Sequence, residues 1–169
     1  MIWLMRVVSN TSPVSNLAII GRLELLRAKY DRVFIPQAVH DELARLTHGT
    51  GAAAIQNALA SGWLVVEAVA DRRLLPVLTA RVDAGEAEAL ELARQTGADL
   101  LLIDDQDGRQ IAREEKLPFT GLLGVLAEER IAGRLPSLKA EIDRLRRECR
   151  FFISPELERS VLDRVGEKT

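Results

Sequence analysis

Cysteine and histidine are scarce in this chain of 169 residues, and their scarcity excludes several kinds of site. Cys149 is the single cysteine, so the sequence holds neither a disulfide framework nor a cysteine-based zinc site. The two histidines, His40 and His48, form no His-Glu-x-x-His motif, and we interpret them as ordinary surface or helix-flank residues. A metal site in this chain would therefore use oxygen ligands.

Long apolar runs and nucleotide-binding loops are missing too. The apolar stretch MIWLM is too short for a signal peptide or a membrane span, so we expect a soluble, cytoplasmic protein without a membrane role. No GxGxxG motif follows the first predicted strand and no GxxxxGK[ST] motif occurs, which disfavours nucleotide-cofactor enzymes. The net charge of −2 does not indicate a protein wrapped in nucleic acid, although most of the cationic residues are arginine, which binds phosphate well.

Apolar runs alternate with helical patterns along the chain. Strands are predicted at 6–9, 32–35, 63–69, 98–103 and 117–120. Helices are predicted at 13–20, 22–29, 37–46, 52–60, 84–96, 108–116, 122–132, 138–147 and around 155–165, with 71–80 irregular or partly helical. This alternation predicts an α/β domain with a central parallel sheet of about five strands and helices on both faces. We expect one domain over residues 1–169.

Polar side chains follow the predicted strands. Asn10 comes after the first strand in RVVSNTSP, and Asp104 and Asp105 come after the fourth in LLLIDDQDGR. Parallel strands end at the same edge of a sheet, where binding crevices lie. Glu42 stands in the helix after the second strand, and Glu86 in the first turn of its helix in DAGEAEALELA. These oxygen donors suit Mg²⁺, which can promote displacement at a phosphodiester.

Each of these residues also has a purely structural interpretation. Glu86 with Asp83 matches a capping box, Asp105 matches a helix N-cap, and Glu42 matches a solvated helix face. The Asn10 side chain can bond the backbone of a turn before Ser12 caps the next helix. Asp104 is the hardest to explain structurally, because a carboxylate that ends a buried apolar run needs a partner or a cation.

The ordered motifs VVSNTSPVSNLAIIGRLELL, VFIPQAVHDEL, DAGEAEALELA, LLLIDDQDGRQIA and FTGLLGVL resemble the PIN-domain superfamily, in particular its prokaryotic toxin-type (VapC-like) ribonucleases. The resemblance covers roughly residues 6–135, with a helical extension at 136–169. It implies a three-layer α/β/α fold and a nuclease that uses Mg²⁺ or Mn²⁺. The implied metal ligands are Asn10, Glu42, Glu86 and Asp104, with Asp105 as a competitor for the last place, and the implied catalytic carboxylates are Glu42, Glu86, Asp104 and Asp105. Thr11 and Ser12 occupy the place of a hydroxyl near the metal.

Asn10 departs from the pattern that the sequence resembles, because the usual residue at this position is Asp. The resemblance implies an RNA endonuclease, the toxin-like component of a toxin–antitoxin pair, whose partners would be RNA and a small antitoxin protein. The amide motivates an alternative, a catalytically silent scaffold that binds RNA or a protein partner. A receiver-like phosphoacceptor is disfavoured, because the Asp pair follows the fourth strand and not the first.

Three further features have two interpretations each. Arg109 can contact phosphate or be an exposed helix residue. The arginines at 144, 146, 147 and 150 can bind RNA or form a solvated helix face. The apolar side chains of the first two helices predict a homodimer or antitoxin surface, or simply belong to the core; they are Leu17, Ile19, Ile20, Leu23, Leu25 and Leu26. The choice between RNA and DNA, and between Mg²⁺ and Mn²⁺, is not determined by the sequence.

Overall fold

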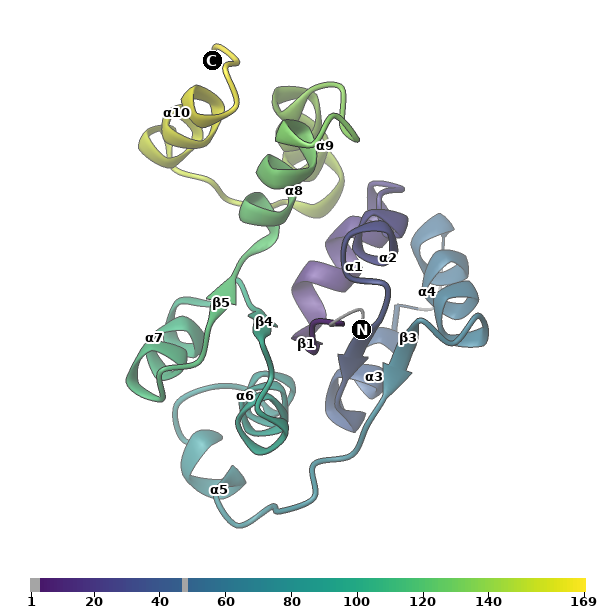
Figure 1. Cartoon of the computed structure of the whole chain (residues 1–169), viewed down its shortest axis with the longest axis vertical. Helices are drawn as coiled ribbons and strands as arrows, with labels where there is room; N and C mark the ends of the chain where they lie inside the picture. Colours follow the sequence, from purple (N-terminus) through teal and green to yellow (C-terminus); the bar gives the residue numbers. More distant parts are fainter. Residues whose placement is uncertain (1–3, 47–48) are drawn as a thin grey trace.

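The computed structural model describes residues 4–46 and 49–169, so His48 lies outside the described residues. Five strands form one sheet in the order β3-β2-β1-β4-β5, and each neighbouring pair is parallel (Figure 1). The strands are β1 Val7–Ser9, β2 Val33–Ile35, β3 Leu64–Val66, β4 Leu100–Leu102 and β5 Phe119–Thr120. The predicted parallel sheet of five strands is therefore confirmed.

The helices agree with the predicted ones to within a few residues at each end. They are α1 Thr11–Ile19, α2 Glu24–Tyr30, α3 Gln37–Ala44, α4 Thr50–Ala60, α5 Leu75–Leu78, α6 Ala84–Thr96, α7 Gln106–Glu114, α8 Leu122–Ile131, α9 Leu138–Cys149 and α10 Pro155–Arg164. The partly helical segment at 71–80 contains only the single turn α5. No helix in the described ranges has the length and apolar character that crossing a membrane requires.

Two hydrophobic cores cover the two faces of the sheet, because side chains alternate along each strand. Val7 and Leu102 belong to the larger core, together with α1, α2, α4 and the C-terminal helices α8, α9 and α10. Val8 and Leu101 point to the opposite face and pack with α6 and α7. Figure 1 shows these layers, with α6 and α7 separated from α1 and α4 by the strands. The result is a three-layer α/β/α fold.

The early apolar helices mostly serve this larger core. Four of the six side chains predicted as a dimer or antitoxin surface are buried within the chain itself, namely Leu17, Ile20, Leu23 and Leu26. Ile19 and Leu25 are half-buried. The core interpretation therefore accounts for most of this apolar surface, and the homodimer stays a prediction.

The order of the strands decides where a binding crevice can form. The chain moves from β1 outward to β2 and β3, and then returns to place β4 on the other side of β1. In such sheets the crevice opens at the carboxyl ends of the two strands where the direction of winding reverses. Here those two strands are β1, which leads into Asn10, and β4, which leads toward Asp104.

Candidate active site

Asn10 lies between β1 and α1 and has only 3% of its surface exposed. It is the N-cap residue of α1, but its side chain makes no capping hydrogen bond. Its amide oxygen Oδ1 is buried and has no hydrogen-bond partner among the described residues. The structural interpretation with Ser12 as the cap is therefore wrong, because α1 already begins at Thr11. Ser12 is half-buried in the first turn of α1.

Asp104 follows β4 at the same sheet edge as Asn10, because β1 and β4 are neighbouring parallel strands and the Asn10 N–H donates to the Leu102 carbonyl (2.9 Å). Asp104 Oδ1 accepts a hydrogen bond from the Leu122 N–H at the start of α8 (2.9 Å). Its other oxygen, Oδ2, is buried without a hydrogen-bond partner in the described part of the chain. Burial raises the pKa of Asp104, although the Leu122 N–H and the Arg109 charge act in the opposite direction.

Arg109 is fixed on the same side of the crevice. Its Nη2 lies 3.6 Å from Asp104 Oδ1, and its Nε donates to the Ile103 carbonyl (3.0 Å). Gly121 makes this arrangement possible, because a Cβ there would lie 2.5 Å from Asp104 Oδ1 and would collide with the guanidinium. Arg109 is half-buried and oriented, so it is more than an exposed helix residue.

Glu42 is half-buried in α3, and the Thr11 hydroxyl donates a hydrogen bond to its Oε2. A Cβ at Gly85 would lie 2.5 Å from Glu42 Oε1, so the carboxylate fits against the first turn of α6 only because residue 85 is glycine. Negative charge is favoured there by the N–H groups and dipole of a helix. Glu42 is therefore held in place and is not simply a residue of a solvated face.

Glu86 and Asp83 form the predicted capping box. Asp83 accepts from the Glu86 N–H (2.8 Å), and Glu86 Oε2 accepts from the Asp83 N–H (3.1 Å). Burial raises the pKa of Glu86 to about 7, and the charges of Asp83, Asp105 and Glu42 contribute to the rise. Asp105 is exposed and is also the predicted N-cap, since its Oδ2 accepts from the Gly108 N–H (2.9 Å). Capping and participation in an acidic cluster thus coexist at these positions.

The structure brings the predicted residues together as two adjacent groups. Glu42, Glu86 and Asp105 are close enough for their charges to interact, and Thr11 bonds to the first of them. Asp104 instead interacts with Arg109 and Leu122 on the other side of the crevice. Throughout residues 4–46 and 49–169, no three His, Cys, Asp or Glu side chains are grouped so that they could hold a metal ion.

The donors nevertheless fit a hard divalent cation. Asn10 Oδ1 and Asp104 Oδ2 are buried oxygens without hydrogen-bond partners at the ends of adjacent strands. A buried polar atom without a partner is costly, and coordination to a cation removes that cost. Mg²⁺ commonly takes one or two carboxylates and completes its shell with water and substrate phosphate, so a ready group of three carboxylates is not required.

Two of the four arginines that were candidates for RNA binding form ion pairs within the protein. Arg144 pairs with Glu148 (3.2 Å) on the same helix, and Arg146 pairs with Glu158 of α10. Arg146 thereby joins α9 to α10, whereas Arg144 pairs within α9. For Arg147 and Arg150, an RNA contact stays a prediction.

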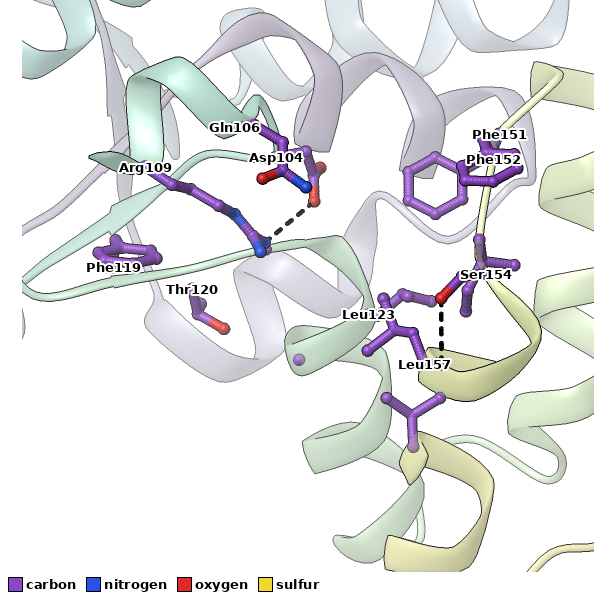
Figure 2. Close-up of a pocket in the computed structure, with 14 residues that line it drawn as sticks. Asp104, Gln106, Arg109, Phe119, Thr120, Leu123, Phe151, Phe152, Ser154 and Leu157 are labelled. Atoms are coloured by element: carbon purple, nitrogen blue, oxygen red, sulfur yellow. Dashed lines mark hydrogen bonds and ion pairs between the residues drawn. The ribbon is translucent and has the colours of Figure 1, made fainter. Parts of the chain in front are cut away.

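A groove of about 500 Å³ begins at Asp104 and was not predicted from the sequence. Arg109, Phe119 and Thr120 line one end, and Phe151 and Phe152 line the side opposite Asp104 (Figure 2). The far side comes from the segment between α9 and α10, more than 40 positions later in the chain than Asp104. Only the glycine after β5, in FTGLLGVL, signals from sequence that a polar group needs space nearby.

The comparison with protein families identifies the fold. The family model of the PIN domain (DUF3368) matches residues 6–167. The chain belongs to the PIN-domain family. PIN domains generally include nucleases and typically use divalent metal ions, and the match runs through the C-terminal helices. None of the curated proteins matches the chain.

A solved structure supports the same fold. The chain is similar to a PilT N-terminus domain protein, SSO1118, from the hyperthermophilic archaeon Sulfolobus solfataricus P2, with a TM-score of 0.54 and 20% sequence identity. The match covers 73% of this chain and 92% of the archaeal one. At this level of identity the likeness establishes the fold and nothing about substrate.

Proposed function

We propose that this PIN-domain protein is a metal-dependent RNA endonuclease and the toxin-like component of a toxin–antitoxin pair. The observation that carries the proposal is the pair of buried oxygens without hydrogen-bond partners, Asn10 Oδ1 and Asp104 Oδ2, at the reversal point of the sheet. Membership of a family that generally includes nucleases supports the reaction class. The toxin role rests on the sequence resemblance described above.

The chemistry that a bound divalent cation would supply at this site is a lowered pKa of water and stabilisation of negative charge on the phosphate. Asn10 and Asp104 would hold the cation, together with Glu42 or Glu86. Hydrolysis joins the water oxygen to phosphorus, breaks one P–O ester bond and transfers a proton to a base. Glu86 is suited to that proton, because its pKa is about 7.

Arg109 and Thr11 act as positioning residues in this scheme. Arg109 lies beside Asp104 and can neutralise a phosphate that approaches the crevice. The Thr11 hydroxyl fixes the orientation of Glu42. Ser12, on the same turn of α1, is the neighbouring hydroxyl available to substrate.

The silent scaffold that binds RNA or a protein partner is the alternative, and two observations favour it. Asn10 supplies a neutral oxygen where the resemblance implies a carboxylate, and the described residues lack a group of three metal-ligating side chains. A scaffold of this kind would bind its partner without cleaving RNA, and its binding would not respond to Asp104→Asn.

Cleavage of a labelled structured RNA by purified protein in Mn²⁺ or Mg²⁺ separates the two functions. EDTA and Asp104→Asn should each abolish cleavage if the proposal holds, and Asn10→Asp should raise the rate at low cation concentration. Absence of cleavage by folded protein that is free of any copurified partner would refute the nuclease and favour the scaffold.

A further inference from the structure

The groove that begins at Asp104 includes aromatic residues that have no role in the proposed catalytic reaction. Asp104 and Arg109 are the acidic and basic residues that line it, and its other lining residues are uncharged, with three phenylalanines among them. Phe152 is the outlier, because 86% of its surface is exposed. A single exposed apolar residue is ordinary, but this one lines the same groove as a proposed metal ligand (Figure 2).

Phe152 is held outward by anchored neighbours. Phe151 packs against the larger core, and its N–H donates to the Leu145 carbonyl of α9 (3.2 Å). Ile153 is buried, and Ser154 caps α10 by accepting from the Leu157 N–H (3.2 Å). The segment between the two helices is therefore fixed on both sides of residue 152, so its ring is presented to solvent by the fold.

Phe119 and Phe152, at the two ends of the groove, also differ in what packs against their rings. Arg109 and Arg113 both lie over the Phe119 ring, with distances of 5.8 and 5.2 Å to its centroid. Within the described ranges, no lysine or arginine lies over Phe152. Phe119 thus already packs with two guanidinium groups, of which that of Arg109 lies near Asp104, whereas the faces of Phe152 are free to receive another flat ring.

We propose that Phe152 is a stacking platform for an unpaired base of single-stranded RNA whose phosphate lies at Asp104. This inference rests on the proposed function, because it places the substrate relative to that site. Base stacking needs an exposed aromatic face, and the phosphate needs a cationic residue, which Arg109 provides at the opposite end. A groove of about 500 Å³ has the size of a small-ligand site.

The test uses the full chain, a fluorescent eight-nucleotide single-stranded RNA, and Phe152→Ala and Phe152→Trp variants. Val77→Ala on α5 is the matched control, because Val77 is also an exposed apolar residue (64%) and does not line the groove. Thermal unfolding should be the same for all variants, since the side chain of Phe152 is almost fully exposed. Binding is measured by anisotropy in EDTA, and cleavage by initial rates in Mn²⁺.

Phe152→Ala should weaken binding and raise KM by roughly 5- to 100-fold, the range expected for one base stacked on an aromatic ring, while kcat changes little. Phe152→Trp should restore both, and its fluorescence should be quenched by the RNA. Oligonucleotides with one abasic position each then locate the base. At one position, base removal should weaken binding to the wild type but not to Phe152→Ala.

The outcomes separate this inference from the nuclease proposal. Wild-type cleavage with no effect of Phe152→Ala on KM or binding overturns the stacking platform and leaves the nuclease intact. RNA binding that depends on Phe152 without any cleavage supports the platform and refutes the nuclease. If Phe152→Ala impairs capture of a protein partner and leaves RNA binding unchanged, the groove is a protein-docking site and the inference is wrong.

Discussion

The buried carboxylates at the candidate site differ from those elsewhere in the fold in how they are paired. Five of the six buried glutamates in the described chain have an arginine as ion-pair partner; they are Glu88, Glu91, Glu129, Glu141 and Glu158. The sixth, Glu86, has no basic partner among the described residues, and it lies at the candidate site. Asp104 has only Arg109, at 3.6 Å, and one oxygen without a hydrogen-bond partner.

The difference indicates what each set is for. A buried charge that is paired and hydrogen-bonded can be part of the scaffold, whereas an unpaired one with a raised pKa points to a functional site. Some of these pairs are local, as Glu91 with Arg94 within α6, and others join distant segments, as Glu141 joins α9 to Arg22 before α2. Glu86 and Asp104 belong to the candidate site, where a cation and a phosphate would supply further partners.

The largest expected effect is the loss of activity in Asp104→Asn. The variant should cleave RNA at least about 100-fold more slowly, because a neutral amide cannot replace the negative charge that would hold the cation. Its free energy of unfolding should stay the same or rise, since the substitution removes a charge whose pKa burial has raised. Cleavage assays and urea denaturation on one preparation test both. A clear loss of stability would place Asp104 among the scaffold carboxylates.

The next largest effect is on stability. Here the free energy of unfolding should fall, whereas in Asp104→Asn it should stay the same or rise. Glu129→Gln should lower the free energy of unfolding by about 2–4 kcal/mol, because Glu129 is fully buried and accepts two hydrogen bonds from Arg134 (2.6 and 2.8 Å). Glu86→Gln is the matched variant and should cost less than about 1 kcal/mol, since it removes an unpaired charge and retains a hydrogen-bonding side chain. Equal costs in urea denaturation would remove the distinction between the two sets.

A divalent cation should stabilise the folded protein through the carboxylates of the candidate site and not through the paired glutamates. Mn²⁺ at ten- to thirty-fold above its dissociation constant should raise the free energy of unfolding by about 1.4–2 kcal/mol. The gain should be much smaller in Asp104→Asn and unchanged in Glu129→Gln. Thermal unfolding across a Mn²⁺ titration measures it, and an equal gain in Asp104→Asn would locate the binding elsewhere.

The smallest effect concerns pH. Burial raises the pKa of Glu167, but N–H groups of Lys139 and Leu138 at the start of α9 and the side chain of Arg130 outweigh it and bring the pKa to about 2. A carboxyl with a lowered folded pKa stabilises the fold above its ordinary pKa, and this contribution is lost as the pH falls toward 2. Urea denaturation between pH 5 and pH 2.5 should therefore show a smaller decline in Glu167→Gln than in the wild type. Parallel declines would contradict the assignment.

Much of this structure follows from local sequence signals. Strand and helix positions were predictable because apolar periodicity and caps act over a few residues, as in the capping box of Asp83 and Glu86. The start of α1 was mispredicted, since Pro13 suggested a first helical residue and Ser12 a cap. Asn10 is the N-cap residue of α1 but makes no side-chain capping hydrogen bond, so the usual rule for capping residues does not identify it.

The sequence by itself determined the α/β class, the parallel sheet and the set of polar residues at the strand ends, because these depend on periodicity and on strand polarity. Only the tertiary structure decided which charges have partners. It pairs Glu141 with Arg22 and leaves Asp104 Oδ2 without a hydrogen bond, and it folds Phe152 back to the groove at Asp104. Ion pairs and grooves depend on contacts between distant segments, and a single sequence does not encode those distances in any local pattern.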